Sequence, residues 1–289
     1  DVCSSDLGLI IPQNVVVDTF GGAVTYNDPF GNGAATLTGT SNVITLGNND
    51  TVQNILISGG TNGISGNAIS NATVTNVNIS GSSQNGISLV NTTGTQSLTD
   101  LVIDTVGTNG INLSNAGIAS ITGATTINNT GANGILSTNT NLMVASAAIG
   151  TTGAVAGDGI VVNNTDGTSR TFSLSSTNLG TGLLNIGDRG VVLSSTGAGT
   201  LTANLDSTSI FSTNGSLVTT DSGTAKQLVM SLGATGNMQF NRSSAGFAVD
   251  VTGSALNSTI VQSLGATTSN MTVTGGGVHF NRVTFDGSG

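Results

Sequence analysis

Ionisable side chains are scarce in this 289-residue chain and belong to few types. The chain has 14 acidic residues, all of them Asp, against five Lys and Arg together and a single His, and its formal net charge is −9. General acid/base catalysis needs two titratable groups that converge on one substrate, and a Ca²⁺ site needs several oxygen ligands. The spacing of these few residues therefore decides which chemistry the chain can perform.

Two aspartates are the strongest candidates for a metal site. Asp158 and Asp188 lie one and two residues before recurring glycines, at corners that we take as equivalent in neighbouring repeats. Across adjacent parallel strands, about 4.8 Å apart, their carboxylates would lie close enough to share one Ca²⁺. Solvated turns, with Arg189 neutralising one carboxylate, explain the same residues without an ion. We favour this interpretation and expect no metal and no cofactor.

The other ionisable residues are not spaced to work together. His279 alternates with Val278 and Phe280, which predicts an outward polar residue rather than a metal ligand. Asp100 and Asp104 lie on one predicted strand and the corner that follows it. The arginines are scattered along the second half of the chain, at Arg170, Arg189, Arg242 and Arg282. Because no acid and base are expected to meet on one substrate, we predict no catalytic residue.

A recurring tripeptide sets the elements that would position these residues. Asn or Asp, then Gly, then Ile return with glycine spacings of 23, 24, 24 and 25 residues, and weaker glycine matches continue at steps of 31, 25, 31 and 31. The five full tripeptides begin at Asn62, Asn85, Asn109, Asn133 and Asp158, and the weaker glycines are Gly190, Gly215, Gly246 and Gly277. Such a period predicts a solenoid of about nine coils.

Each predicted coil contains three short strands. Apolar residues alternate after the glycine, so the isoleucines of the tripeptides should form one inward ladder, made of Ile64, Ile87, Ile111, Ile135 and Ile160. About half a period later, two apolar pairs flank a residue that breaks the alternation: Asn54, Asn76, Asp100 and then Gly123. These residue types tolerate a positive φ and are predicted to be structural corners. The fold class is therefore all-β, a right-handed parallel β-helix with coils of 23–31 residues.

The residues before the tripeptide glycines form a second predicted column. Asn62, Asn85, Asn109, Asn133 and Asp158 should stack along the helix axis. An asparagine ladder, in which each side-chain amide bonds the next, satisfies these groups without a ligand. We therefore interpret this corner ladder as structural.

The chain is predicted to contain one β-helix domain over residues 41–289, with short regular coils in 41–187 and longer coils in 188–289. Residues 8–40 are expected to form an N-terminal cap or an incomplete first coil. Residues 1–7 (DVCSSDL), with the only cysteine, resemble a translated sequencing adapter, and the alternative is an ordinary polar N-terminus with a free thiol. We expect the natural protein to be longer than this chain at both ends.

Composition excludes several function classes. Only 7% of the residues are charged, against roughly 25% in ordinary globular proteins. A negative chain without a basic cluster is unsuited to nucleic acid and to anionic membrane surfaces. No run approaches the roughly twenty apolar residues of a membrane-spanning helix, so we expect no direct membrane insertion of this segment.

The Gly-Ile-x-Leu steps, with Asn or Asp at the half-coil corner, resemble the β-helix repeats of the pectate-lyase-like superfamily. The segment 41–52 (SNVITLGNNDTV), followed by 57–64 (ISGGTNGI), resembles more particularly passenger segments of bacterial surface proteins, including inverse autotransporters and large adhesins. The repeat resemblance covers about residues 41–200. It implies a β-helix fold, and it leaves activity open because this fold carries both enzymes and inert stalks.

Resemblance to the enzymes of this superfamily implies residues that the chain lacks. Polygalacturonases imply clustered Asp pairs, a Gly-His-Gly and an Arg-x-Lys, whereas pectate lyases imply carboxylates gathered for Ca²⁺ beside an Arg base. The chain has no adjacent Asp pair, and His279 is its only histidine. We therefore expect a structural or adhesive passenger or stalk. The alternative is a β-helical polysaccharide lyase or glycoside hydrolase whose active coils are degenerate or missing.

The resemblance to surface proteins also implies where the chain works. We expect it outside the cell, at a bacterial cell surface, with an export signal and an anchor that are not in this sequence. Its expected partners are glycans or proteins on host or neighbouring cells.

Overall fold

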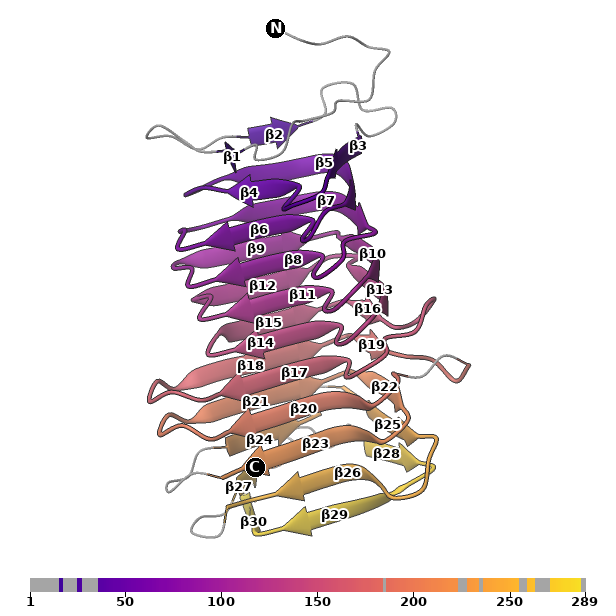
Figure 1. Ribbon diagram of the computed structural model, residues 1–289. Coiled ribbons are helices and arrows are strands. Elements are labelled where there is room, and N and C mark those ends of the chain that lie inside the picture. The colour runs from indigo at the N-terminus through magenta and orange to yellow at the C-terminus, as the bar shows by residue number, and fades with distance from the viewer. Residues whose placement is uncertain are drawn as a thin grey trace, which may run out of the picture.

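The computed structural model describes residues 16–17, 25–27, 36–183, 186–222, 228–233, 236–254, 259–262 and 271–286. Within them it contains 30 strands and no helix. The strands stack into a parallel β-helix, as the sequence predicts (Figure 1). The front strands run to the left while the chain descends from its N-terminal end, and the other strands pass behind them, so the coil is right-handed.

One face of the helix is a parallel sheet of 11 strands, which we call sheet A. Each of its strands starts at or near a repeat corner. The strands are β1 (Val16–Val17), β4 (Ile44–Leu46), β6 (Ile64–Asn67), β8 (Ile87–Val90), β11 (Ile111–Ser114), β14 (Ile135–Thr138), β17 (Ile160–Asn164), β20 (Arg189–Ser195), β23 (Gly215–Asp221), β26 (Phe247–Thr252) and β29 (Gly277–Asn281).

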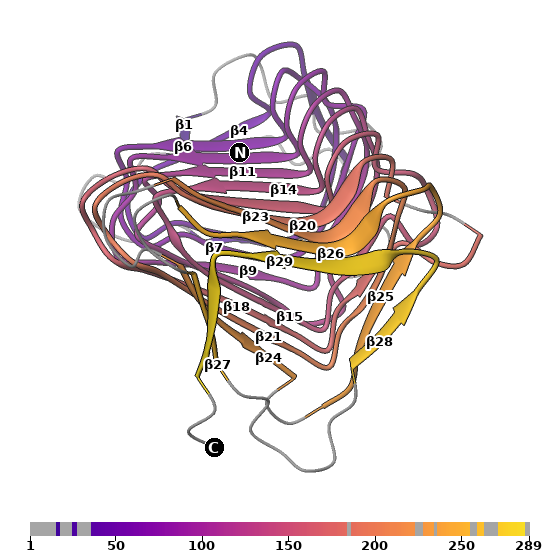
Figure 2. The ribbon, with the colours of Figure 1, turned by 90° about the horizontal axis from the view of Figure 1, so that it is seen from below.

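Two further ladders, sheets B and C, complete the tube and are joined where β5 and β7 run through both. Sheet B comprises β2 (Thr25–Asn27), β5 (Thr51–Gly59), β7 (Thr73–Ser80), β9 (Thr95–Thr99), β12 (Ile118–Thr122), β15 (Asn141–Ala145), β18 (Arg170–Ser175), β21 (Leu201–Asp206), β24 (Leu228–Leu232), β27 (Thr259–Gln262) and β30 (Val283–Asp286). Sheet C adds β3 (Thr36–Gly39), β10 (Val102–Val106), β13 (Thr126–Thr130), β16 (Ala148–Ile149), β19 (Asn178–Leu179), β22 (Ser209–Ser212), β25 (Met238–Arg242) and β28 (Met271–Thr274). Seen along its axis, the tube has three sides (Figure 2).

The core is one continuous cluster of apolar side chains inside this tube. Alternation along each strand sends every second side chain inward, and parallel in-register pairing stacks like on like. The tripeptide isoleucines show this directly: Ile64, Ile87, Ile111, Ile135 and Ile160 pair consecutively across sheet A and are all fully buried. Each coil therefore covers the apolar side chains of the next one.

Sheet A begins earlier than the tripeptide period indicates. The nine predicted positions correspond to β6 through β29, and β4 and β1 extend the sheet beyond them. Residues 42–44 occupy the place of the tripeptide, because Val43 N donates to Asn62 O at 3.0 Å and Ile44 N donates to Gly63 O at 3.0 Å. Valine replaces glycine at position 43, and this substitution hides the coil from a search for the tripeptide.

The register of the last coils corrects two predicted repeat positions. Val191 pairs with Leu217 and Leu217 with Val249, so the structural equivalents of Gly190 are Ser216 and Ala248. The sequence matches at Gly215 and Gly246 are therefore displaced by one and two residues, because Gly215 aligns with Arg189 instead of Gly190 and Gly246 lies one place further upstream. Residues 1–7, and most of the predicted cap at 8–40, lie outside the described residues.

Candidate functional site: the asparagine corner

The corner ladder lies where the chain enters the strands of sheet A. Each asparagine donates from its side-chain Nδ2 to the Oδ1 of the asparagine one coil earlier. These distances are 2.8 Å from Asn62 to Asn42, 2.9 Å from Asn85 to Asn62, 3.0 Å from Asn109 to Asn85 and 3.0 Å from Asn133 to Asn109. The ladder thus begins at Asn42, one coil before the sequence predicts, and all its donors point toward the N-terminal end.

The space beside the ladder explains the glycine of the tripeptide. A Cβ built at Gly63, Gly86, Gly110 or Gly134 would lie 2.4–2.6 Å from the Cγ2 of an inward isoleucine at the end of the same coil. Those isoleucines are Ile79, Ile103, Ile127 and Ile149. The same Cβ would lie 2.6–2.8 Å from the carbonyl oxygen of the equivalent glycine in the next coil. No larger residue therefore fits without displacing backbone.

The ladder ends at Asp158, because a carboxylate has no proton to donate to Asn133. Asp158 N donates to Asn133 Oδ1 at 3.1 Å, and the carboxylate turns to the next coil. There Arg189 donates to it from its backbone N at 3.0 Å, from Nε at 2.9 Å and from Nη2 at 2.8 Å. Arg189 therefore caps the carboxylate at the end of the ladder with a bidentate ion pair.

The predicted equivalence of Asp158 and Asp188 is wrong. The corner residue after Asp158 is Arg189, since Gly159 N donates to Arg189 O at 2.8 Å. Asp188 lies one residue upstream, level with Gly157, and its Oδ2 is 3.5 Å from Arg189 Nε. The guanidinium occupies the position that a shared ion would need. Among the described residues, no three His, Cys, Asp or Glu side chains gather into a metal-binding group.

The neighbouring aspartates keep the Arg189 guanidinium positively charged. Burial alone would lower its pKa, but the hydrogen bonds and charge of Asp158, together with the charge of Asp188, outweigh that effect and raise the pKa above its usual value. The guanidinium consequently stays protonated in both the folded and unfolded states near neutral pH. On the alkaline side, the stability that it contributes is lost as the pH rises through the folded-state pKa.

Arg189→Ala is expected to lower the free energy of unfolding by about 2 kcal/mol. The change removes the guanidinium from the Asp158 carboxylate, which keeps the backbone N–H of residue 189 and whose side chain is only 9% exposed. The loss stays below the roughly 3–5 kcal/mol of a fully buried pair, because the arginine is 37% exposed. Urea unfolding measures it. Adding Asp158→Asn should restore part of the loss, since an amide can donate to Asn133; no rescue would contradict the proposed role.

A second column of corners lies between sheets B and C. Asn54, Asn76 and Asp100 have φ of 57°, 52° and 53°, and Gly123 has φ of 69°. The column continues with Ser146, Ser176 and Ser207 at 60°, 49° and 49°. These serines were not predicted from the sequence, because serine is not among the residue types that mark this conformation.

Substitution at Asn76 tests the cause of these corners. Asn76→Gly should change the free energy of unfolding by less than about 1 kcal/mol, since glycine adopts positive φ freely and only the exposed 2.8 Å bond to Asn54 is lost. Asn76→Val should cost about 1–3 kcal/mol, because a β-branched side chain resists that conformation. Thermal unfolding of the two variants compares them directly, and equal losses would refute the backbone explanation.

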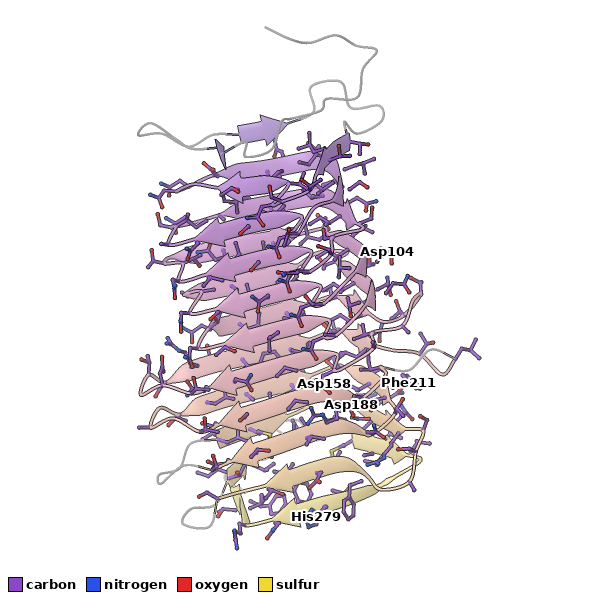
Figure 3. All side chains as sticks on the ribbon, viewed as in Figure 1. Asp104, Asp158, Asp188, Phe211 and His279 are labelled. Carbon is purple, nitrogen blue, oxygen red and sulfur yellow. The ribbon has the colours of Figure 1, made fainter. Side chains whose placement is uncertain are left out.

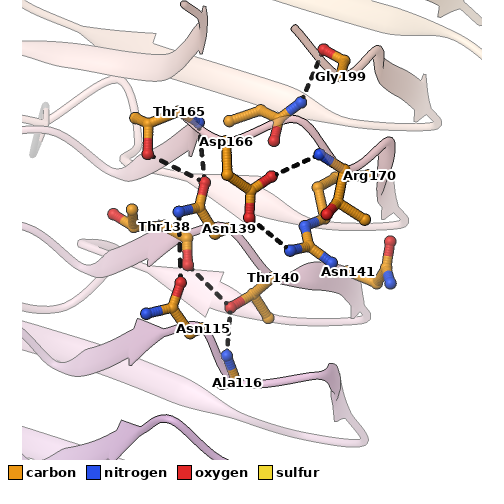
Figure 4. Close-up of polar contacts among 12 residues, drawn as sticks. Asn115, Ala116, Thr138, Asn139, Thr140, Asn141, Thr165, Asp166, Arg170 and Gly199 are labelled. Atoms are coloured by element: carbon orange, nitrogen blue, oxygen red, sulfur yellow. Dashed lines mark hydrogen bonds and ion pairs between the residues drawn. The ribbon is translucent and has the colours of Figure 1, made fainter. Parts of the chain in front are cut away.

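A third column is a shorter asparagine ladder, which was also not predicted from the sequence. Asn115 Nδ2 donates to Asn91 Oδ1 at 3.1 Å. Asn139 Nδ2 donates to Asn115 Oδ1 at 3.3 Å (Figure 4). Asn139 Oδ1 accepts bonds from the backbone N and the hydroxyl of Thr165. The three asparagines follow sheet A strands at a spacing of 24 residues, which is the signal that would have revealed them.

The remaining ionisable side chains are distributed along the tube (Figure 3). Asp100 accepts a bond from Ala124 N at 2.8 Å, and Asp104 accepts one from the amide of Asn129 at 2.6 Å. His279 lies on the outer face of β29, half-exposed, with Nδ1 2.9 Å from Asp250 Oδ1. Its ring stacks on Phe247 with centroids 4.8 Å apart. The structure thus pairs His279 with Asp250, whereas Asp100 and Asp104 each make a separate polar contact.

In the part of the chain that the structure describes, no helix is long and apolar enough to cross a membrane. Comparison of the chain with protein-family models, with curated proteins and with solved structures finds no match.

Proposed function

We propose that this chain is a structural or adhesive segment, the passenger or stalk of an extracellular bacterial surface protein. The observation that carries the proposal is the unbroken axial stack of coils around one apolar core. Eleven stacked strands at about 4.8 Å per step extend roughly 50 Å. Three polar columns brace the corners along this axis, which suits a rod that holds a binding surface away from a cell.

The outer faces support a role in contact with neutral partners. Outward positions of sheet B carry hydroxyl and amide groups in register, such as Thr73 beside Ser97 and Thr99 beside Thr122. The hydroxyls of Thr99 and Thr122 lie 3.0 Å apart and bond across adjacent coils. Arrays of this kind can exchange hydrogen bonds with glycans or with protein surfaces on host or neighbouring cells.

The charge distribution favours such partners over charged polymers. The formal net charge is −9, and most of the few cations are engaged locally: Arg170 with Asp166, Arg189 with Asp158, and Arg242 with backbone carbonyls of the loop after it. Contacts made mainly by neutral groups should depend little on salt, because Debye screening acts on charges. Partner binding that resists salt is therefore the expected signature.

Beads coated with the folded protein, applied to arrays of cell-surface glycans and matrix proteins, test the proposal. We expect saturable binding that changes less than about twofold between 0.1 and 1 M salt. Beads coated with urea-unfolded protein are the control for nonspecific attachment. If the beads bound none of the array components saturably, the adhesive role would be contradicted.

The enzymatic alternative is tested by incubating the protein with acidic polysaccharides, with and without Ca²⁺, and measuring unsaturated or reducing ends. The proposal predicts no release of either product. Ca²⁺-dependent cleavage that disappears in Asp158→Ala would replace the structural role with that of a polysaccharide lyase.

A further inference from the structure

The corner ladder contains four Asn-Gly dipeptides, at Asn62, Asn85, Asn109 and Asn133. In flexible chains this dipeptide loses ammonia spontaneously, because glycine has no side chain to keep its backbone nitrogen from the asparagine side-chain carbon. A protein with four such dipeptides in neighbouring coils should deamidate readily unless the fold prevents it.

The fold restrains each reacting group separately. The nucleophile is the backbone nitrogen of the glycine, and it is held by a hydrogen bond. Its N–H donates to the backbone carbonyl of the corner asparagine in the next coil, at 3.1 Å for Gly86 and 3.0 Å for Gly110. The electrophile is held by bonds at both ends of the amide: Asn109 Nδ2 donates to Asn85, and Asn109 Oδ1 accepts from Asn133. Each glycine is also closely packed, because an isoleucine methyl group would lie 2.4–2.6 Å from a Cβ added there.

We propose that the corner ladder is a set of latent deamidation sites, protected in the folded coils and reactive once a coil opens. In an open coil the glycine nitrogen attacks Asn Cγ and the N–Cγ bond forms. The glycine N–H proton passes to Nδ2, the Cγ–Nδ2 bond breaks, and ammonia leaves. Water then opens the resulting succinimide at either carbonyl. The product is aspartate, or isoaspartate with one additional backbone methylene.

Either product is incompatible with the middle of the ladder. At Asn109 the new carboxylate would face Asn85 Oδ1, an acceptor that the amide formerly satisfied. The one acidic member of the ladder shows what a carboxylate requires, because Asp158 receives three donors from Arg189. The groups bonded to the Asn109 side chain are neutral amides. An isoaspartate would also displace the strand register by its extra methylene. A coil that opens and deamidates therefore keeps a covalent change that hinders its refolding.

Peptide mapping by mass spectrometry tests the protection. The protein is incubated in mildly alkaline buffer, folded or unfolded in urea, and the fraction of aspartate and isoaspartate is followed at each of the four asparagines. We expect the folded rates to be at least about tenfold lower than the unfolded rates. Equal rates in the two states would overturn the proposal.

Asn85→Ala tests whether the ladder bonds themselves protect the sites. The variant removes the acceptor of Asn109 Nδ2, so deamidation of the folded protein should rise severalfold at Asn109 and remain slow at Asn133. An equal rise at all remaining sites would show that global unfolding, not the ladder, sets the rate. That result would contradict local protection.

Two charge-matched variants test the consequence. Asn109→Asp reproduces the deamidated ladder, and Asn112→Asp adds the same charge three residues away on β11, where the amide makes only a 3.4 Å bond to Ser88. We expect Asn109→Asp to lower Tm by roughly 3 °C or more and Asn112→Asp to lower it by less than half as much. Equal shifts would refute the claim that the ladder rejects a carboxylate.

Discussion

Replacing Ile111 by alanine should lower the free energy of unfolding by about 2–5 kcal/mol. Ile111 is fully buried between Ile87 and Ile135, which belong to the coils before and after it. The coils are tied at a fixed spacing by ladder bonds, including Ile87 N to Gly110 O at 3.0 Å and Ile111 N to Gly134 O at 3.0 Å. Because the backbone cannot collapse into the space, most of the cavity should persist. Urea unfolding monitored by circular dichroism gives the loss.

Asn112→Ala is the matched control on the same strand. Its side chain faces outward, and its removal should cost less than about 0.5 kcal/mol. If the two variants lost the same stability, the assignment of inner and outer faces would be incorrect.

Replacing Gly110 by alanine is expected to cost about 3 kcal/mol, at the upper end of the usual range for overpacking. The new methyl group would lie 2.4 Å from Ile127 Cγ2 and 2.6 Å from the carbonyl oxygen of Gly134. The first neighbour is a buried core side chain, and the second is a backbone atom bonded to Ile111 N. Neither can move without disturbing the next coil. Thermal unfolding measures the resulting loss of stability.

Gly167→Ala supplies the comparison. A Cβ at Gly167 meets no atom within 4 Å, and this glycine has no positive φ that would strain alanine. The change should therefore be neutral or slightly stabilising. A neutral Gly110→Ala would mean that the tripeptide glycine is not required by packing.

The tripeptide was sufficient to predict the fold from sequence because three of its properties have separate physical causes. Asparagine bonds its equivalent in the next coil, glycine leaves room for an isoleucine methyl, and isoleucine fills the core. Each cause acts once per coil, so the period is visible at Asn62, Asn85, Asn109 and Asn133 without any knowledge of the structure.

Prediction failed where a different residue performs the same role. Val43 stands at the glycine position of an early coil, and Ser146 takes the positive φ that asparagine or glycine takes elsewhere. Arg189 replaces the corner asparagine and still donates toward the N-terminal end, an equivalence that a pattern of Asn or Asp before Gly cannot show. The contact between Asp250 and His279 spans 29 residues and depends on the register of two long coils. Spacing alone could not place that pair.

The claim on which the whole account depends is that successive coils are interchangeable units stacked along one axis. Deleting residues 85–132 removes two 24-residue periods and joins Gln84 to Asn133, so Asn133 should take over the bond to Asn62. Small-angle X-ray scattering of this variant tests the claim. We predict a folded rod whose maximum dimension is shorter by about 10 Å, two steps of about 4.8 Å. An unfolded scattering profile, or a folded particle of unchanged length, would contradict the account.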